Sequence, residues 1–288
     1  MRLSKNKIFF IIFISLITFS LFCVFTTSVS FAQNSFTAEA YSTTAKSAIV
    51  IDKNTGKVLF EKNADEKLPI ASTTKILTAI TVIENIDDLF KTVSVPDCAI
   101  GVEGSSIYLE KGERLKVIDL LYGLMLQSGN DCAVALACLT SGSVENFARL
   151  MNIVAINAGA TNSHFCNPHG LHDKNHYSTA RDMSLISAYA MRNETFRKIV
   201  STTNYVDCPY ADRGYNRIIK NKNKILTTLD GGNGIKTGYT KVAGRCLVSS
   251  AQRKNVEIIC VVLSCGPMFE ESCDLINKAF AELGVNDE

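Results

Sequence analysis

The strand-like segments of this 288-residue chain gather near its two ends, and this distribution limits the possible folds more than any other feature. Residues 48–52 and 58–61 flank the sequence Lys-Asn-Thr-Gly, a pattern typical of a β-hairpin. Residues 246–251 and 256–263 form two more β-rich runs, joined by a short polar turn. We therefore predict one antiparallel sheet that is built from both ends of the chain, with a helical insertion between them.

The insertion carries apolar residues at helical spacing. Val117, Leu120, Leu121 and Leu124, for example, follow the i, i+3, i+4, i+7 pattern of one helix face. Helices are expected from Ser72 through Ile83 and over residues 115–126, 132–139, 144–160 and 178–193, with a last amphipathic helix from about Glu271 to Leu283. These elements predict an α/β protein of the α+β kind, in which helices flank the antiparallel sheet and form a helical subdomain.

Residues 1–32 have the features of an export signal. Three basic residues precede an almost wholly apolar run over residues 8–25, and small residues at positions 30 and 32 offer a cleavage site before Gln33. The apolar run is near the lower limit of a membrane span, so an uncleaved N-terminal anchor is the alternative. Residues 33–46 lack an apolar period and are interpreted as a linker, and residues 47–285 as one folded domain.

The charge of the chain argues against a nucleic-acid partner. The formal net charge is +2, and loss of residues 1–32 with their three basic side chains would leave about −1 (2 − 3). No basic stripe is present in the sequence. We therefore expect neither a nucleic-acid partner nor any membrane attachment other than through the N-terminal segment.

Cysteine and histidine are the residues that raise the question of disulfides and metals. Nine of the ten cysteines follow the signal, without a C-x-x-C pair, and most lie in apolar strings typical of buried free thiols. A set of disulfides is the alternative, since the chain is predicted to be exported. All four histidines fall in the irregular segment 161–177, but their spacing matches no known zinc pattern. We expect no metal and no organic cofactor.

The sequence Ser72-Thr73-Thr74-Lys75 places a hydroxyl and an amine three residues apart at a predicted helix start. One helical turn brings both side chains to the same face. A lysine with a lowered pKa can act as the base that activates a serine nucleophile, and the free N–H groups of a helix start favour developing negative charge. Taken alone, the pattern also fits an N-capping serine beside a solvated lysine.

Two further motifs follow in order, and together the three change this interpretation. Ser128-Gly129-Asn130 interrupts two apolar helices, where a helix-capping turn is the alternative, and Lys236-Thr237-Gly238 precedes the C-terminal strands. This ordered trio is the signature of class A β-lactamases and penicillin-binding proteins.

The chain resembles the low-molecular-weight penicillin-binding proteins that are D-alanyl-D-alanine carboxypeptidases, serine peptidases of the β-lactamase/DD-peptidase superfamily. The resemblance covers about residues 40–285 and extends to His169-Gly170-Leu171, the run 177–183 and Gly234–Thr240. The run 177–183 favours the carboxypeptidases over β-lactamases.

The resemblance implies roles for the reacting groups. Ser72 would attack the carbonyl between the last two D-alanines of a peptidoglycan pentapeptide stem, and Lys75 would take its proton. Ser128 would relay a proton towards the departing D-alanine. The backbone N–H groups of Ser72 and Tyr239 would form the oxyanion hole. β-Lactam antibiotics would acylate Ser72 and leave a slowly hydrolysed ester.

The resemblance also implies which residues bind the substrate. Asn130 would hold a substrate amide, Lys236 and Thr237 the terminal carboxylate, and Gly238 would let the substrate backbone approach the strand. Lys236 would also help to keep Lys75 neutral. Strand alternation, however, sends the side chains of Lys236 and Thr237 to opposite faces, and the sequence does not show how one cleft reaches both.

Two departures from the family pattern leave alternatives open. Segment 264–271 contains no Arg or Lys, whereas many members carry a carboxylate-binding basic residue there. Many members also continue into a second β-rich domain and a C-terminal anchor; we expect neither here, so any membrane attachment would come from the N-terminus. With the export signal, we expect an exported protein that acts in the cell wall or at the outer face of the cytoplasmic membrane. A weakly active peptidoglycan-binding scaffold and a DD-endopeptidase are the alternative functions. A β-lactamase is disfavoured because the loop 161–177 lacks a glutamate to activate water.

Overall fold

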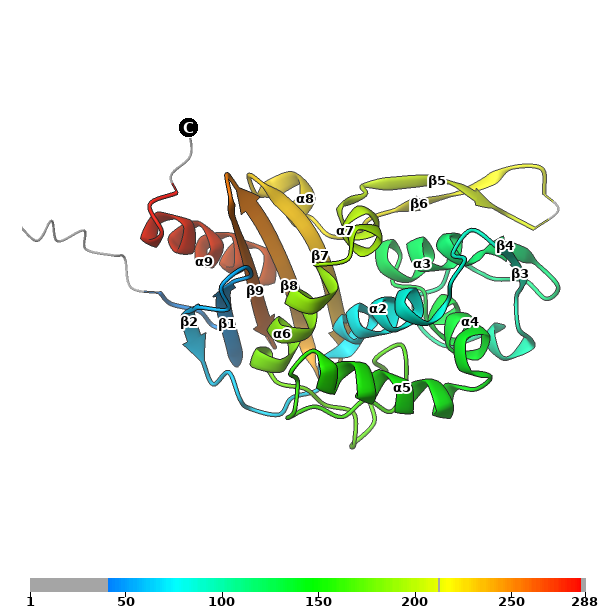
Figure 1. The fold of residues 1–288 in the computed structure, drawn as a ribbon, viewed down its shortest axis with the longest axis horizontal. Coiled ribbons are helices and arrows are strands. Elements are labelled where there is room, and N and C mark those ends of the chain that lie inside the picture. The colour runs from blue at the N-terminus through cyan, green and yellow to red at the C-terminus, as the bar shows by residue number, and fades with distance from the viewer. Residues whose placement is uncertain (1–40, 212, 286–288) are drawn as a thin grey trace, which may run out of the picture. The chain divides into compact units, whose positions relative to one another are not determined.

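One five-stranded antiparallel sheet joins the two ends of the chain in the computed structural model, which describes residues 41–211 and 213–285 (Figure 1). The strand order is β2-β1-β9-β8-β7. The strands are β1 (Ser47–Asp52), β2 (Val58–Lys62), β7 (Gly232–Thr240), β8 (Gly244–Arg253) and β9 (Val256–Leu263). The pairing of β1 with β9 confirms the prediction of a sheet built from both ends of the chain. The predicted export signal lies outside the described residues.

The helical insertion runs from the end of β2 to the start of β7. Its helices are η1 (Ala71–Thr74), α2 (Lys75–Asn85), η2 (Asp97–Ala99), α3 (Val117–Leu126), α4 (Asn130–Ser141), α5 (Val144–Asn157), α6 (Ala180–Ala190), α7 (Glu194–Ser201) and α8 (Ile225–Thr228). Outside the insertion, helix α9 (Met268–Glu282) follows the last strand. Two small two-stranded sheets lie within it: β3 (Thr92–Ser94) pairs with β4 (Arg114–Lys116), and β5 (Asn204–Pro209) forms a hairpin with β6 (Asn216–Lys220). The mixture of helices and antiparallel strands is the fold class expected from the sequence.

Side-chain alternation along the central strands divides the core into two layers. Ile49, Val248 and Val261 face the layer that contains α2 and α6, whereas Val50 and Cys260 face α9. Figure 1 shows α9 on one side of the sheet and α2 and α6 on the other. Each such aliphatic side chain contributes about 1.5–3 kcal/mol when it is fully buried. β9 is buried on both faces, which explains its nearly continuous apolar sequence.

Two elements differ from the sequence-based expectation. The helix predicted over residues 178–193 is α6 (Ala180–Ala190), and α7 is a further helix that was not predicted. It starts where the side chain of Asn193 accepts a hydrogen bond from the Phe196 N–H. Strand β6 was not predicted from the sequence; in it, Ile219 is buried and the neighbouring Ile218 is 74% exposed. The β5–β6 hairpin is short and exposed, and its buried face is small. The alternation of apolar and polar residues that marks a strand is therefore weak in its sequence.

The loop 161–177 is irregular, as expected, and packs directly on the turn that carries Ser72. Its Gly170 has a φ of +84°, a backbone conformation that suits glycine. A Cβ atom at this position would lie 1.9 Å from the carbonyl oxygen of Ala71. The loop therefore approaches η1 as closely as a glycine permits.

This contact predicts that Gly170→Ala destabilises the protein by about 2–4 kcal/mol, since the added methyl combines backbone strain with overpacking. Gly56→Ala is the matched control, because Gly56 also has positive φ (+75°) but open space around its Cβ position. We expect the control to cost only about 1–2 kcal/mol. Denaturant midpoints measure both, and equal losses would contradict the proposed steric contact.

Candidate active site

Ser72 and Lys75 are in direct contact at the junction of η1 and α2. Lys75 Nζ lies 3.0 Å from Ser72 Oγ, and the lysine side chain is completely buried. Two further oxygens surround the same nitrogen: Asn130 Oδ1 at 2.7 Å and the carbonyl oxygen of His169 at 2.8 Å. These last two oxygens can only accept hydrogen bonds. A neutral Lys75 amine has two N–H bonds, which it can donate to these two oxygens. Its lone pair then points to Ser72, and the Ser72 hydroxyl donates its hydrogen bond to that lone pair.

The surroundings of Lys75 favour this neutral form. Burial lowers the pKa of Lys75 well below its ordinary value, and the positive charge of Lys236 lowers it further. Burial and the charge of Lys222 also lower the pKa of Lys236, to about 7. Both lysines are thus less basic than an exposed lysine, and Ser72 lies beside an amine that is ready to accept its proton.

The Ser128-Gly129-Asn130 turn brings the third hydrogen-bonding group to Lys75. Asn130 begins α4, and its Nδ2 and backbone N–H donate to the carbonyl oxygens of Glu103 and Ser105, each at 2.6 Å. The helix therefore starts without a side-chain cap, unlike the capping turn that was the alternative interpretation. Ser128 is buried and has a φ of +63°, a conformation that costs a non-glycine residue about 1–3 kcal/mol and recurs at functional sites.

Strand β7 lies against the turn that carries Ser72. A Cβ atom on Gly238 would lie 3.0 Å from the Ser72 backbone nitrogen, so glycine permits this approach. Lys236 is buried and its Nζ donates to the Thr237 carbonyl oxygen at 3.0 Å, whereas Thr237 is half-buried and Tyr239 is 64% exposed. β7 is the edge strand of its sheet. The side chains of Lys236 and Thr237 point to opposite faces of the sheet, but both lie beside the same unpaired backbone edge of β7. A cleft along this edge can therefore be reached by both residues.

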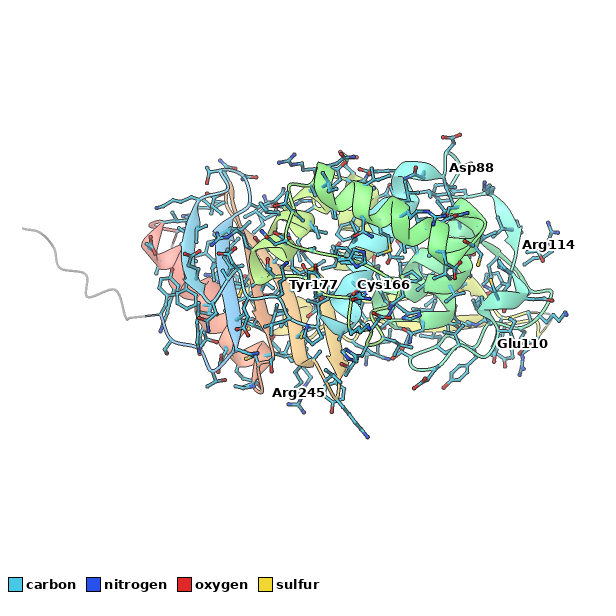
Figure 2. All side chains as sticks on the ribbon, turned by 90° about the horizontal axis from the view of Figure 1, so that it is seen from below. Asp88, Glu110, Arg114, Cys166, Tyr177 and Arg245 are labelled. Carbon is cyan, nitrogen blue, oxygen red and sulfur yellow. The ribbon has the colours of Figure 1, made fainter. Side chains whose placement is uncertain are left out.

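The loop 161–177 holds the remaining side of the site, and Cys166 and Tyr177 mark it in Figure 2. The Cys166 N–H donates to Nδ1 of His176, so Nε2 carries the proton and donates to Thr74 Oγ1 at 2.8 Å. Burial lowers the pKa of His176 to about 4, which keeps this ring neutral. Within the described residues, no group of three or more His, Cys, Asp and Glu side chains is placed to hold a metal ion.

The sequence motifs thus meet in space. Hydrogen bonds connect Ser72, Lys75 and Asn130 directly, Gly238 abuts Ser72, and the charge of Lys236 acts on Lys75. Thr237 and Tyr239 are immediate chain neighbours of Gly238, and Ser128 lies two residues before Asn130. The carbonyl group of His169 is the one contributor to this cluster that sequence reasoning did not name, because a backbone oxygen has no residue-type signal.

Comparison with known proteins gives the same grouping. Residues 34–266 match the model of the Peptidase_S11 family, described as D-alanyl-D-alanine carboxypeptidase. The chain belongs to this family.

Three relatives illustrate the similarity. The chain is 36% identical to the D-alanyl-D-alanine carboxypeptidase DacF of Bacillus subtilis over 83% of its length, and 37% identical to DacC of Escherichia coli over 85%. These matches span 62% and 63% of the two relatives' own lengths. The crystal structure of the Streptomyces K15 DD-transpeptidase superposes with a TM-score of 0.78 at 32% identity, covering 83% of this chain and 98% of that one. The chain is also 36% identical to a Streptomyces sp. (strain K15) protein that is named D-alanyl-D-alanine carboxypeptidase. This match covers 74% of this chain and 78% of that protein.

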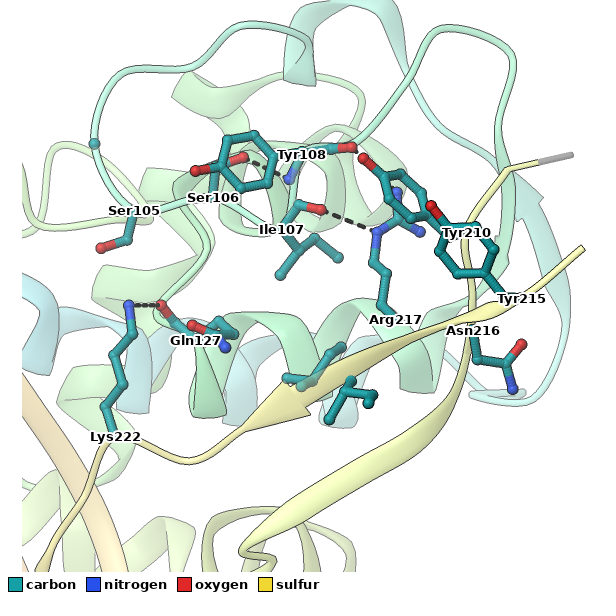
Figure 3. Close-up of a pocket in the computed structure, with 13 residues that line it drawn as sticks. Ser105, Ser106, Ile107, Tyr108, Gln127, Tyr210, Tyr215, Asn216, Arg217 and Lys222 are labelled. Carbon is teal, nitrogen blue, oxygen red and sulfur yellow. Dashed lines mark hydrogen bonds between the residues drawn. The ribbon is translucent and has the colours of Figure 1, made fainter. Parts of the chain in front are cut away.

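A cavity of about 610 Å³ adjoins the site of this S11 family member, between the loop 104–108 and the β5–β6 hairpin (Figure 3). Gly104 connects the two, since it lines the cavity and a Cβ atom there would lie 2.5 Å from Asn130 Nδ2. Figure 3 shows Tyr210 and Tyr215 at one end, Lys222 at the other, and Tyr108 between them. The reacting side chains do not line this cavity, so it extends the site and is not its centre.

Two cations from other segments approach the segment 264–271, which itself lacks Arg and Lys: Lys224, whose Nζ lies 5.7 Å from the centroid of the Phe269 ring, and Arg245. Arg245 on β8 pairs in register with Tyr239 on β7, and its Nη1 donates to the Gly266 carbonyl oxygen at 3.1 Å. Figure 2 shows Arg245 at the end of the sheet. Residues that pair across antiparallel strands share a face, and Thr237 lies two residues from Tyr239 on that face. A guanidinium from a neighbouring strand thus lies where the segment offers no positive charge of its own.

The pKa of Lys75 provides a direct test of the electrostatic account. Lys236→Met removes a buried positive charge, so the pKa of Lys75 should rise towards its ordinary value and less of the neutral amine should be present at neutral pH. Lys241→Met is the control, since Lys241 is exposed in the turn between β7 and β8. An NMR titration of ¹³C-labelled lysine side chains measures the change, and an unaltered Lys75 titration in Lys236→Met would exclude the coupling.

Proposed function

We propose that this S11 family member is a serine-type D-Ala-D-Ala carboxypeptidase that removes the terminal D-alanine from peptidoglycan pentapeptide stems. The observation that carries the proposal is the buried Lys75 amine, which is surrounded by two obligate acceptors and the Ser72 hydroxyl. This arrangement suits proton abstraction from Ser72 at neutral pH. The names of the relatives favour the same activity.

Acylation begins when Ser72 Oγ attacks the carbonyl carbon between the two D-alanines and Lys75 Nζ takes the hydroxyl proton. The negative charge that develops on the carbonyl oxygen is met by the backbone N–H groups of Ser72 and Tyr239, from a turn and a strand that are in contact through Gly238. Ser128 returns a proton to the amine of the departing D-alanine. A water molecule then hydrolyses the ester and regenerates Ser72.

The open edge of β7 holds the substrate backbone as an added strand. Asn130 binds a substrate amide from the opposite wall, while Thr237, together with the positive charge of Lys236, binds the terminal carboxylate. Gly238 leaves room for the peptide beside Ser72. The cavity next to Asn130 receives the part of the stem peptide that precedes the two D-alanines.

The substrate sets the compartment and the partners. Peptidoglycan lies outside the cytoplasmic membrane, which accords with an export signal in residues 1–32 and a catalytic domain over residues 47–285. Within residues 41–211 and 213–285, no helix has both the length and the hydropathy to cross a membrane. Peptidoglycan stems are the proposed substrates, and β-lactams the covalent inhibitors that acylate Ser72.

A transpeptidase is the second candidate, because a structure of the same fold carries that name. The acyl-enzyme is common to both reactions, and they differ in whether water or an amine attacks it. The loop 161–177 contains no glutamate, a residue that would assist the rapid hydrolysis typical of a β-lactamase.

Release of D-alanine from a pentapeptide that ends in D-Ala-D-Ala tests the proposal with the full chain. Ser72→Ala should lower the rate by about four to six orders of magnitude, since loss of a nucleophile removes the covalent route. Ser201→Ala, which alters an exposed serine on α7, should retain activity. A folded wild-type chain that releases no D-alanine would contradict the carboxypeptidase. Release of D-alanine together with transfer of the remaining peptidyl group to an added amine, without hydrolysis of the acyl-enzyme, would favour the transpeptidase.

Arg245 is proposed to supply the carboxylate-binding cation that segment 264–271 lacks. Arg245→Gln should raise KM for the pentapeptide roughly tenfold with little change in kcat, which is the usual size of a lost charged hydrogen bond. Lys241→Gln is the control for general loss of positive charge. The same peptide with a C-terminal amide should show no difference between wild type and Arg245→Gln. An equal KM increase for both peptides would make Arg245 a structural residue only.

A further inference from the structure

Cys98 and Cys138 form a close pair of thiols outside the active site. Their Sγ atoms lie 2.6 Å apart, although the residues are 40 positions apart in the sequence. Cys98 belongs to the short helix η2 and is exposed, whereas Cys138 lies on α4 and is partly buried. Within the described part of the chain, no other pair of cysteines has its sulfur atoms in such contact.

We propose that Cys98 and Cys138 are a redox site, which forms a disulfide between η2 and α4 when the protein meets an oxidising exterior. An S–S bond of about 2.0 Å requires only a small further approach of the two sulfur atoms. The predicted export of the chain takes both residues to a compartment where disulfides persist. The inference goes beyond the proposed peptidase activity and does not depend on it.

The chemistry requires an external oxidant, and a low-molecular-weight disulfide of the glutathione type suffices. The exposed Cys98 reacts first: its thiolate attacks the small disulfide, forms a mixed disulfide and releases one small thiol. Cys138 then attacks Cys98 Sγ and releases the second small thiol. The two cysteines lose two protons and two electrons, and the small disulfide gains them. Cys98 is the entry point because its thiol is exposed, whereas that of Cys138 is partly buried.

This disulfide would strengthen a connection that already reaches the active site. The loop that follows η2 accepts two hydrogen bonds from Asn130, through the carbonyl oxygens of Glu103 and Ser105. Asn130 is the first residue of α4, the helix that also carries Cys138. The loop and the helix are thus joined at one end by Asn130 and would be joined at the other by the disulfide. Oxidation would therefore restrict opening of the loop that holds the Asn130 side chain.

Peptide mapping of the full chain tests the proposal. The native protein is equilibrated with oxidised glutathione, remaining thiols are blocked with N-ethylmaleimide during denaturation, and tryptic peptides are analysed without reductant. We expect the peptide of residues 92–111 linked to that of residues 117–149, with the loss of two hydrogen atoms. Because the second peptide also contains Cys132, fragmentation must place the maleimide on Cys132 and the link on Cys138.

Variants separate this link from adventitious oxidation. Cys98→Ser should abolish the linked peptides, while Cys273→Ser, which alters a partly buried cysteine on α9, should retain them. Oxidation should raise the Tm of the wild type by about 5–10 °C and leave that of Cys98→Ser unchanged, because the bond closes a long loop in the unfolded chain. The proposal fails if both thiols remain open to N-ethylmaleimide, if Cys98 is recovered only as a glutathione mixed disulfide, or if Cys138 is found linked to Cys132.

Discussion

The complete burial of one lysine amine is the constraint on which the rest of the site depends. A buried ammonium group is costly, so Lys75 is held in surroundings that favour its neutral form. The amine then needs acceptors for its two protons. Asn130 from the start of α4 and the His169 carbonyl group from the loop 161–177 supply them, and the lone pair is left for Ser72. Three segments that are distant in sequence thus meet at one nitrogen atom.

The fold around this nitrogen explains why the sheet is built from both ends of the chain. β7 lies so close to η1 that a Cβ atom at position 238 would make tight contacts of 3.0–3.1 Å, which favours glycine there, and β7 is held in place by pairing through β8 and β9 to β1. The same arrangement leaves the outer edge of β7 without a partner strand. An edge strand beside a nucleophile is suited to bind an extended peptide, which connects the topology with the proposed substrate.

Much of this organisation could be predicted from the sequence, because the apolar patterns of the buried elements are strong. The β1–β2 hairpin, strands β8 and β9 and the core helices follow from them, and the i, i+3 spacing correctly predicted the contact of Lys75 with Ser72. Weakly buried elements were missed, such as strand β6 with its exposed Ile218. Contacts between distant segments, among them the His169 carbonyl group, the reach of Arg245 to Gly266 and the Cys98–Cys138 pair, have no signature in the local sequence.

The central claim is that the buried amine of Lys75 activates Ser72 as a nucleophile, and covalent trapping with benzylpenicillin tests it most directly. After reaction at neutral pH, mass spectrometry of tryptic peptides should find the penicilloyl group on Ser72, in the peptide of residues 68–75. A folded Lys75→Met variant should form this adduct far more slowly, since its Ser72 has no neighbouring base. An adduct on another residue, or an undiminished rate of acylation in Lys75→Met, would contradict the account.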